Sequence, residues 1–201
     1  MKEFIEQLEK GFNDFVDEAK KMKEELVERM KGKKKAPEAG DVVKISGIEW
    51  LILEKTEDVY CAITKDFIDL GMKFDSDKND WRSSELREYL NGEFLEGLEE
   101  DMLLEFERNL TSLDGQTEYG SCMDKVSLLT VDEYRKYRKY LPNTKEWWWL
   151  ITPWSTPCNG KEKLTTVVSP AGCISNDDCF NGIGVRPFCI FKSSIFESEE
   201  K

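Results

Sequence analysis

Aspartates gather at two places where their carboxylates could bind a cation. Asp75, Asp77 and Asp80 share one segment, and Asn176-Asp177-Asp178 forms a second group of oxygen donors. Calcium prefers oxygen ligands of this kind, but the first segment lacks the glycine and the distal glutamate of an EF-hand loop. We interpret both groups as solvated loops and expect no metal and no cofactor, with calcium binding as the alternative.

Histidine is absent from the chain, and this absence limits the possible chemistry more than any residue that is present. Histidine is the usual general base near neutral pH and the partner of nucleophilic serine or cysteine in hydrolases. The six cysteines include no C-x-x-C pair, so their spacing does not indicate a structural zinc site. The sequence therefore predicts a protein that is not an enzyme, and carboxylate-, lysine- or metal-dependent catalysis is the enzymatic alternative.

The composition predicts a folded chain that neither binds nucleic acid nor spans a membrane. Aromatic residues make up 11% of the 201 residues, which is enough for a packed core, and the net charge is −12. Phosphate binding needs clustered Lys and Arg, and no stretch approaches the ~20 apolar residues of a membrane span. The first residues carry acids where a secretory signal has a basic segment. We expect a protein that is cytoplasmic at synthesis.

The N-terminal segment has the pattern of a helix that associates with other helices. Apolar residues alternate spacings of three and four, the a/d seam of a heptad, at Ile5, Leu8, Phe12, Phe15, Ala19, Met22 and Leu26. In this register Glu18 and Lys23 occupy the g and e positions that bridge parallel neighbours. Phe4 and Val16 widen the apolar face, which favours a trimer over a dimer. The alternative is a helix that packs on its own domain.

Shifts in composition divide the chain into three parts. Residues 1–31 form the amphipathic helix, residues 32–40 a Gly- and Lys-rich linker, and residues 41–196 a globular domain. A tether of this kind would let the helix self-associate. The sequence therefore predicts a homo-oligomer.

The globular domain mixes short strands with short helices. Apolar runs between polar turns predict strands at 42–45, 50–53, 59–63, 125–129, 147–152, 165–168 and 185–191. Helices are predicted at 81–92, at 93–98, and from Thr130, where Glu133 completes a capping box. Helices in the middle and antiparallel strands at the end indicate an α+β fold.

Four groups of residues resemble the DUF6273 family, which is found in bacteria and their phages. They are Trp81-x-x-Ser84-x-Leu86-Arg87-x-Tyr89-Leu90-Asn91, Val126-x-Leu128-Leu129-x-x-x-Glu133-Tyr134, Trp148-Trp149-Leu150 and Gly184-Val185-Arg186-Pro187. The last group also resembles the end of the C-type-lectin-like fold. Formylglycine-generating-type enzymes and the variable proteins of diversity-generating retroelements share that fold, but the active-site cysteines of those enzymes are not recognisable here.

The resemblance to the lectin-like fold implies which residues are scaffold and which contact a ligand. The final strands, including Gly184 to Pro187, would be scaffold, and the polar segment before them would form the ligand surface. The implied contact residues are Trp154, Asn159, Lys161, Lys163, Ser175, Asn176, Asp178, Phe180 and Asn181. We expect these side chains to be exposed and to share one face. We also expect Trp81 to be buried and Arg186 to be held by carbonyls or a carboxylate, because a buried charge needs partners.

Together, the residues and the resemblance predict a non-enzymatic protein that binds an unidentified protein or glycan. The resemblance implies a phage or bacterial variable protein, located on a phage particle, whose polar segment is diversified by a retroelement. Several copies joined by the helix would gain avidity without new contacts. The alternatives are a structural oligomer without a ligand and, less favoured, a carboxylate- or metal-dependent enzyme.

Overall fold

The structure of the protein is a computed structural model that describes residues 2–31 and 36–196. The chain divides between Ala36 and Pro37 into two units, which are described separately. Residues 32–35 of the predicted linker lie outside the described part.

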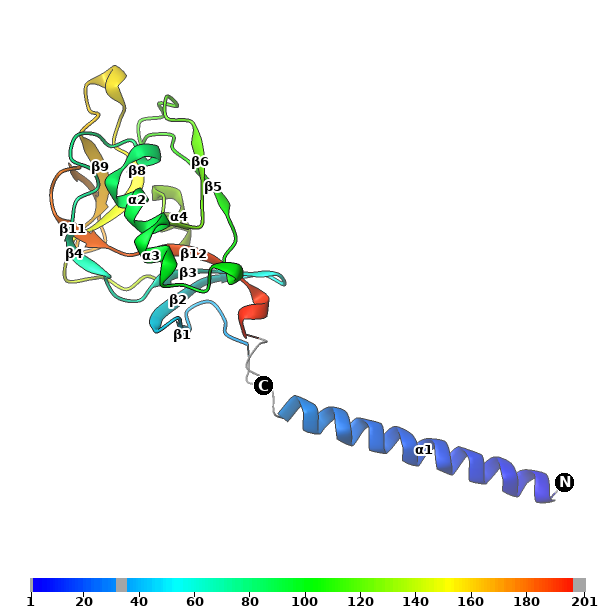
Figure 1. Ribbon diagram of the computed structural model, residues 1–201. Helices are drawn as coiled ribbons and strands as arrows, with labels where there is room; N and C mark the ends of the chain where they lie inside the picture. The colour runs from blue at the N-terminus through cyan, green and yellow to red at the C-terminus, as the bar shows by residue number, and fades with distance from the viewer. Residues whose placement is uncertain (1, 32–35, 197–201) are drawn as a thin grey trace. The chain divides into compact units, whose positions relative to one another are not determined.

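The first unit is the helix α1 (Lys2–Lys31; Figure 1). Taken by itself, the helix leaves Phe12 and Phe15 each 68% exposed and Met22 59% exposed. The side chains of the other large seam residues, Ile5, Leu8 and Leu26, lie outside the described part. Within that part, no helix is both long enough and apolar enough to cross a membrane.

The second unit contains a five-stranded antiparallel sheet with the strand order β1-β2-β3-β12-β7. Its strands are β1 (Val42–Ile45), β2 (Ile48–Lys55), β3 (Val59–Thr64), β7 (Val126–Ser127) and β12 (Phe188–Lys192). The last strand therefore pairs with two strands that lie far from it in sequence. This long-range pairing places the C-terminal segment inside the sheet rather than at its edge.

A second five-stranded sheet has the order β10-β9-β8-β11-β4. Its strands are β4 (Asp69–Met72), β8 (Trp148–Pro153), β9 (Leu164–Val168), β10 (Ile174–Asp178) and β11 (Ile183–Val185). The pairing of β11 with β8 is parallel, and the other pairings are antiparallel. A two-stranded sheet joins β5 (Phe106–Asn109) to β6 (Ser121–Asp124).

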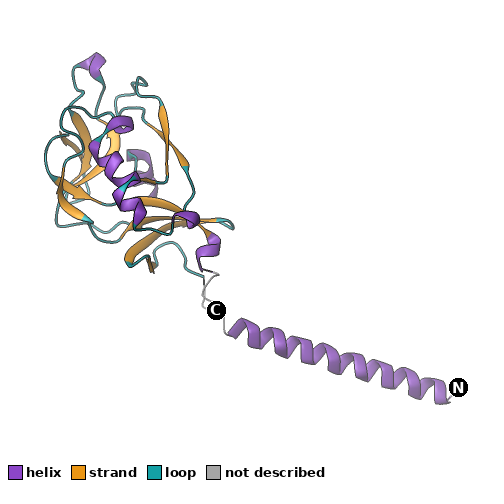
Figure 2. Cartoon of the chain, in the orientation of Figure 1, coloured by secondary structure: helices purple, strands orange, loops and turns teal. Residues whose placement is uncertain are grey.

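Short helices fill the connections between strands, as Figure 2 shows. The α-helices are α2 (Glu85–Asn91), α3 (Glu93–Glu96) and α4 (Val131–Tyr137), and the 3-10 turns are η1 (Trp81–Ser83), η2 (Glu100–Met102), η3 (Pro157–Asn159) and η4 (Ser193–Phe196). The predicted capping box is confirmed, since the Thr130 and Glu133 side chains bond each other's backbone N–H groups. The α+β class is confirmed as well.

Strand β8 is buried on both faces, which makes it the centre of the core. Trp148 and Trp149 are at most 2% exposed and belong to two different hydrophobic clusters, because neighbouring residues of a strand face opposite sides. Trp147 precedes the strand and is 41% exposed. Neither face of β8 is left as an open stacking surface.

The predicted strand at 185–191 is wrong, because it is two strands in two different sheets. Val185 ends β11 in the second sheet, and Phe188 begins β12 in the first. Pro187 between them has no N–H to donate to a continuous ladder. The chain crosses between the sheets at Arg186 and Pro187.

Four strands of the structure were not predicted: β4, β5, β6 and β10. The β10 sequence, Ile-Ser-Asn-Asp-Asp, lacks the apolar/polar alternation that marks a strand with one buried face. In keeping with this, all five of its residues are half-buried. Two residues of the predicted linker contact strand β2. Gly40 donates a backbone hydrogen bond to the Ile52 carbonyl at 2.8 Å, and Glu38 pairs with Lys55, which attaches these residues to β2.

Candidate ligand-binding site

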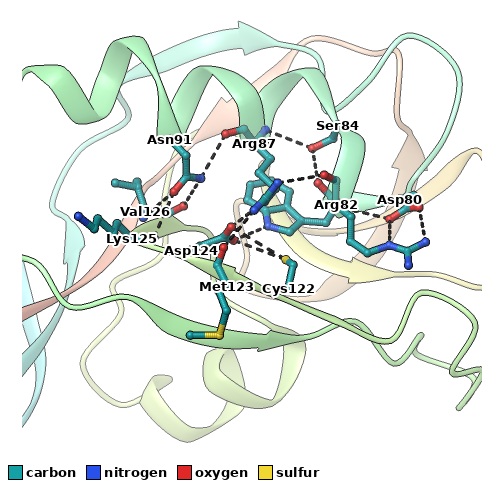
Figure 3. Close-up of polar contacts among 11 residues, drawn as sticks. Asp80, Arg82, Ser84, Arg87, Asn91, Cys122, Met123, Asp124, Lys125 and Val126 are labelled. Atoms are coloured by element: carbon teal, nitrogen blue, oxygen red, sulfur yellow. Dashed lines mark hydrogen bonds and ion pairs between the residues drawn. The ribbon is translucent and has the colours of Figure 1, made fainter.

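A polar cluster around Asp124 fastens helix α2 to strand β6 (Figure 3). Trp81 is fully buried and donates from Nε1 to Asp124 Oδ2 at 2.7 Å, while Arg87 Nε donates to Asp124 Oδ1 at 2.6 Å. Ser84 caps α2 by accepting the Arg87 N–H. The expected burial of Trp81 is confirmed, and both oxygens of the buried carboxylate are occupied by protein donors.

Asn91 extends the same cluster to the start of β7. Its Oδ1 accepts the N–H groups of Lys125 and Val126, and its Nδ2 donates to the Val126 carbonyl at 2.8 Å. An amide that satisfies backbone groups in this way replaces a missing sheet neighbour. The polar residues of the Trp81–Asn91 motif therefore serve the architecture.

A second ion pair, between the buried Arg108 and the half-buried Glu133, joins β5 to α4. Arg108 donates from Nη1 to Glu133 Oε1 at 2.7 Å and from Nη2 to Glu133 Oε2 at 2.6 Å. Burial alone would raise the pKa of Glu133, but the hydrogen bonds and charge of Arg108 hold that pKa below its ordinary value. The guanidinium also lies 5.1 Å from the ring centre of Phe106 and 5.7 Å from that of Phe188. This pair is a structural clamp.

Arg186 joins the two large sheets. It is 1% exposed and donates from Nε and Nη2 to the Thr64 carbonyl, at 3.0 and 2.8 Å, and from Nη2 to the Lys65 carbonyl at 3.0 Å. Its guanidinium lies 5.2 Å from the ring centre of Trp148. Burial lowers the pKa of Arg186 to about 10, so the side chain is charged at neutral pH. The expectation that carbonyls hold Arg186 is confirmed.

The loop after β8 is held in place by the buried amide of Asn79. Asn79 Nδ2 donates to the carbonyls of Ser155 at 2.9 Å, Leu164 at 2.6 Å and Lys161 at 3.3 Å. Its Oδ1 accepts from the Tyr119 hydroxyl at 2.8 Å. One fully buried side chain thus fixes the backbone at both ends and in the middle of residues 155–164.

Asp114 ties the same loop to the turn at residues 112–116. Its carboxylate accepts from the Ser112 hydroxyl at 2.5 Å, the Ser155 hydroxyl at 2.6 Å and Asn159 Nδ2 at 2.8 Å. These hydrogen bonds, that of Ser112 foremost, hold the pKa of Asp114 below its ordinary value. Asp114 is exposed, so its charge is both fixed in place and open to solvent.

The tied loops border a shallow, open depression of about 380 Å³. Its lining consists of Leu113, Asp114, Trp154, Ser155, Asn159 and Lys161. Trp154 is half-buried, whereas Asn159 and Lys161 are exposed. The Lys161 ammonium has no hydrogen-bond partner among the described residues. An aromatic ring, a carboxylate, an amide and an ammonium therefore meet on a surface whose loops are tied together by hydrogen bonds.

The family model for a domain of unknown function, DUF6273, matches residues 50–193. The chain belongs to the DUF6273 family. No curated protein and no solved structure matches the chain. The match covers the polar cluster around Asp124, the Arg108–Glu133 pair, Arg186 and the depression, so these residues lie within the DUF6273 domain.

The structure brings together three of the nine predicted contact residues. Trp154, Asn159 and Lys161 line the depression. Lys163 pairs instead with Asp77, with Nζ 3.5 Å from Oδ1. Phe180 is 42% exposed in the connection after β10, and Asn181 donates to Asp177 Oδ1 at 2.6 Å.

Strand β10 separates the remaining three predicted residues. Ser175, Asn176 and Asp178 are half-buried. Because side chains alternate along a strand, Ser175 faces the opposite side from Asn176 and Asp178. The expectation that all nine residues share one face is therefore wrong. The sequence predicts loops throughout this polar segment, whereas Ile174–Asp178 form a strand whose side chains alternate between two faces.

Two residues of the site were not predicted: Asp114 and Asn79. Asp114 precedes Gly115, whose φ of +88° is the left-handed conformation that favours glycine. This Asp-Gly pair is a turn signal, but nothing in the sequence places the turn beside Ser155. Asn79 lies within the aspartate-rich segment that was interpreted as a solvated loop. Only the fold reveals that it is buried.

The aspartates of residues 75–80 are bound by the protein itself. Asp75 accepts the N–H groups of Asp77, Lys78 and Glu85, and Asp80 accepts from the Arg82 guanidinium. Within residues 2–31 and 36–196, no group of three or more His, Cys, Asp or Glu side chains is arranged to hold a metal ion.

Proposed function

We propose that this protein is a non-enzymatic binding module with a lectin-like DUF6273 domain that contacts its ligand through the depression beside Trp154. The N-terminal helix would present several copies of the domain. In keeping with the resemblance to variable proteins, the role would be recognition of a surface by a phage or a bacterium, with residues 154–181 open to diversification.

The proposal rests on a difference between two sets of polar side chains: one set forms its hydrogen bonds inside the fold, and the other remains at the surface. The polar residues of the family motifs, such as Arg87, Glu133 and Arg186, form hydrogen bonds to other groups of the domain. The side chains around the depression keep hydrogen-bonding capacity at the surface, and the Lys161 ammonium has no partner in the described part. Binding residues commonly lie on loops held by a rigid scaffold. Here the hydrogen bonds of Asn79 and Asp114 tie the loop to the rest of the domain.

The close packing at Gly184 supports the lectin-like scaffold. In the fold that the closing Gly184-Val185-Arg186-Pro187 resembles, the last strands carry the ligand surface without touching the ligand. Here Gly184 leaves no room for a side chain, because a Cβ atom would lie 2.7 Å from the Phe67 ring and from the Trp147 carbonyl oxygen. Such packing fits a scaffold element.

A structural oligomer without a ligand is the second candidate. Strand β10 favours it, since its polar residues do not share one face with the loop residues. An enzyme is the third candidate and would need titratable groups converging on a concave site. Asp114 is such a group, but three protein donors already engage its oxygens, which suits a positioning role better than proton transfer.

Binding of the labelled full chain to a panel of bacterial cells tests the proposal. We expect the wild type to label the surface of some strains. The double variant Asn159→Ala/Lys161→Ala should lose that labelling while still folding, although it removes the hydrogen bonds from Asn159 to Asp114 and Ser155. Lys161→Ala alone should weaken the labelling and keep the wild-type melting temperature, because its side chain is exposed. The control is Ser175→Ala/Asn176→Ala in β10, which should label normally. Labelling that is absent for the wild type, or equal for the loop variant, would contradict the proposal.

A further inference from the structure

A second, larger depression adjoins the one beside Trp154. It has a volume of about 570 Å³ and lies between β5, residues 111–113 and the first turn of α4. Leu113 lines both depressions. The Leu113 N–H donates to the Pro153 carbonyl at 2.8 Å, directly before Trp154. The two hollows therefore lie on either side of one anchored residue.

The charges that line the two depressions nearly cancel. The larger one holds Glu107, Asp132 and Glu133 against Arg108 and Arg135, and the smaller one holds Asp114 against Lys161. Four carboxylates thus face three cations, a net charge of −1, on a chain whose net charge is −12. A site for a polyanion would collect cations, and a site for a polycation would collect carboxylates. This balance indicates an uncharged ligand.

The hydrogen-bonding groups around the hollows include both donors and acceptors. Lys161 offers donors, and Asp132, whose side chain is 92% exposed, offers acceptors. Asn159 Nδ2 donates to Asp114 and Ser155, and its Oδ1 accepts from no donor among the described residues. A hydroxyl group both donates and accepts, so a ligand rich in hydroxyls can use every one of these groups.

The half-buried indole of Trp154 adds an apolar surface to the smaller hollow. Aromatic rings contribute large contact areas at a low cost in conformational entropy. A pyranose ring has C–H groups on its faces and hydroxyls at its edge. Its faces match an indole flanked by an amide and an ammonium, as in this hollow.

We infer that the two depressions form one extended site for a neutral oligosaccharide, with one sugar ring against Trp154 and the next beyond Leu113, beside Glu107 and Asp132. This inference rests on the proposed binding function and names its ligand class. Ligand sites usually measure about 300–1,000 Å³, and each hollow lies in that range by itself. Two linked hollows suit a ligand of more than one ring.

Binding of the full chain to an array of short neutral oligosaccharides, with sulfated oligosaccharides as the charged comparison, tests the inference. We expect retention of neutral members only. Trp154→Ala should weaken that binding at least about tenfold, as for the loss of a central aromatic anchor. Trp147→Ala removes a partly exposed tryptophan outside both hollows and should leave oligosaccharide binding unchanged. Lys161→Ala, at an exposed position, provides a second variant whose folding is not in question and should also weaken binding.

The larger hollow has a test of its own. Glu107→Gln/Asp132→Asn should weaken binding of oligosaccharides at least about tenfold and leave binding of a single sugar unit unchanged. If this variant binds longer ligands as the wild type does, the two-part site is overturned. Absence of neutral oligosaccharide binding, or binding that Trp154→Ala leaves intact, overturns the ligand class.

Treated cells separate failure of this inference from failure of the proposed function. Periodate cleaves the vicinal diols of sugars, and protease removes surface proteins. Cell labelling that depends on Asn159 and Lys161, resists periodate and is lost after protease would overturn the saccharide and leave the binding function standing. Labelling lost after periodate and retained after protease supports the inference. A chain that labels no cells and binds no oligosaccharide overturns both.

Discussion

Single side chains with several backbone partners hold this fold together. Arg186, Asn91 and Asn79 each bond main-chain groups from segments far away in sequence. The net contribution of one hydrogen bond is small, but leaving a buried polar group without its partner costs about 1–3 kcal/mol. Residues that satisfy several such groups at once should therefore be the most sensitive positions of the domain.

Replacing Arg186 tests this view most directly. Arg186→Ala removes a guanidinium that is 1% exposed, leaves the Thr64 and Lys65 carbonyls without their donor, and opens space beside Trp148. We expect a loss of about 2–4 kcal/mol in the free energy of unfolding, measured by urea denaturation. Arg135→Ala, at an exposed surface ion pair, is the control and should change stability by less than about 0.5 kcal/mol. Equal effects of the two substitutions would contradict the role assigned to Arg186.

The Arg108–Glu133 pair predicts how stability depends on pH. The pKa of Glu133 in the folded state lies below its ordinary value of 4.5. Its contribution is therefore fully present above about pH 4.5 and is lost as the pH falls through the lower folded-state pKa. We expect Glu133→Gln to destabilise the protein near neutral pH, and the difference from wild type to shrink as the pH is lowered. Urea denaturation of both proteins at a series of pH values measures this, and a difference independent of pH would contradict it.

At the scale of elements, the sequence predicted what local patterns determine. The capping box at Thr130 and the strand at 147–152 follow from residues close together in the chain, and both are found. The division of the closing strand at Arg186 depends on which sheet each half joins. Strand β10 depends on pairing with β9, which gives a polar segment extended structure that its own residues do not specify. Long-range pairing is the information that local patterns lack.

The candidate site was predictable in part for the same reason. Trp154, Asn159 and Lys161 lie close together in sequence on one loop, and the structure keeps them together. Asp114 and Asn79 reach that loop from 41 and 76 positions away. No pattern within either segment indicates these contacts, so the residues that hold the loop emerge only from the fold.

The loop at residues 155–164 should lose its fixed conformation when Asn79 is replaced. Asn79→Ala removes the donors to the Ser155 and Leu164 carbonyls and the acceptor of the Tyr119 hydroxyl. We expect about 1–3 kcal/mol of destabilisation and faster amide hydrogen exchange across the loop. Asn181→Ala, at an exposed position, is the control and should leave both measurements unchanged. Unaltered exchange in the Asn79 variant would show that other contacts hold the loop.

At the scale of the whole molecule, the two units pose different physical problems. The domain buries its large aromatic side chains, whereas helix α1, taken by itself, leaves two phenylalanines and a methionine largely in water. Exposed apolar side chains at heptad spacing favour association with like helices. In proteins most of the stability of a helix comes from packing of its apolar face, so assembly would supply stability that the isolated helix lacks. Several linked domains would also bind a surface with much higher avidity than one.

Assembly is therefore the prediction that joins the two units. Multi-angle light scattering on the full chain should give an oligomer, with a trimer expected, and a chain that starts at Pro37 should be monomeric. Phe15→Glu/Met22→Glu places charges at two exposed seam positions of the intact chain and should also yield monomers, because charges in an apolar seam oppose association. Glu24→Gln, outside the predicted seam, is the control.

In surface binding the monomeric variant should dissociate at least about a hundredfold faster than the wild type, since linked sites raise avidity by 10²–10⁴, while binding of a soluble single ligand stays the same. A full chain that remains monomeric would mean that α1 has another partner, and the multivalent part of the proposed function would be lost.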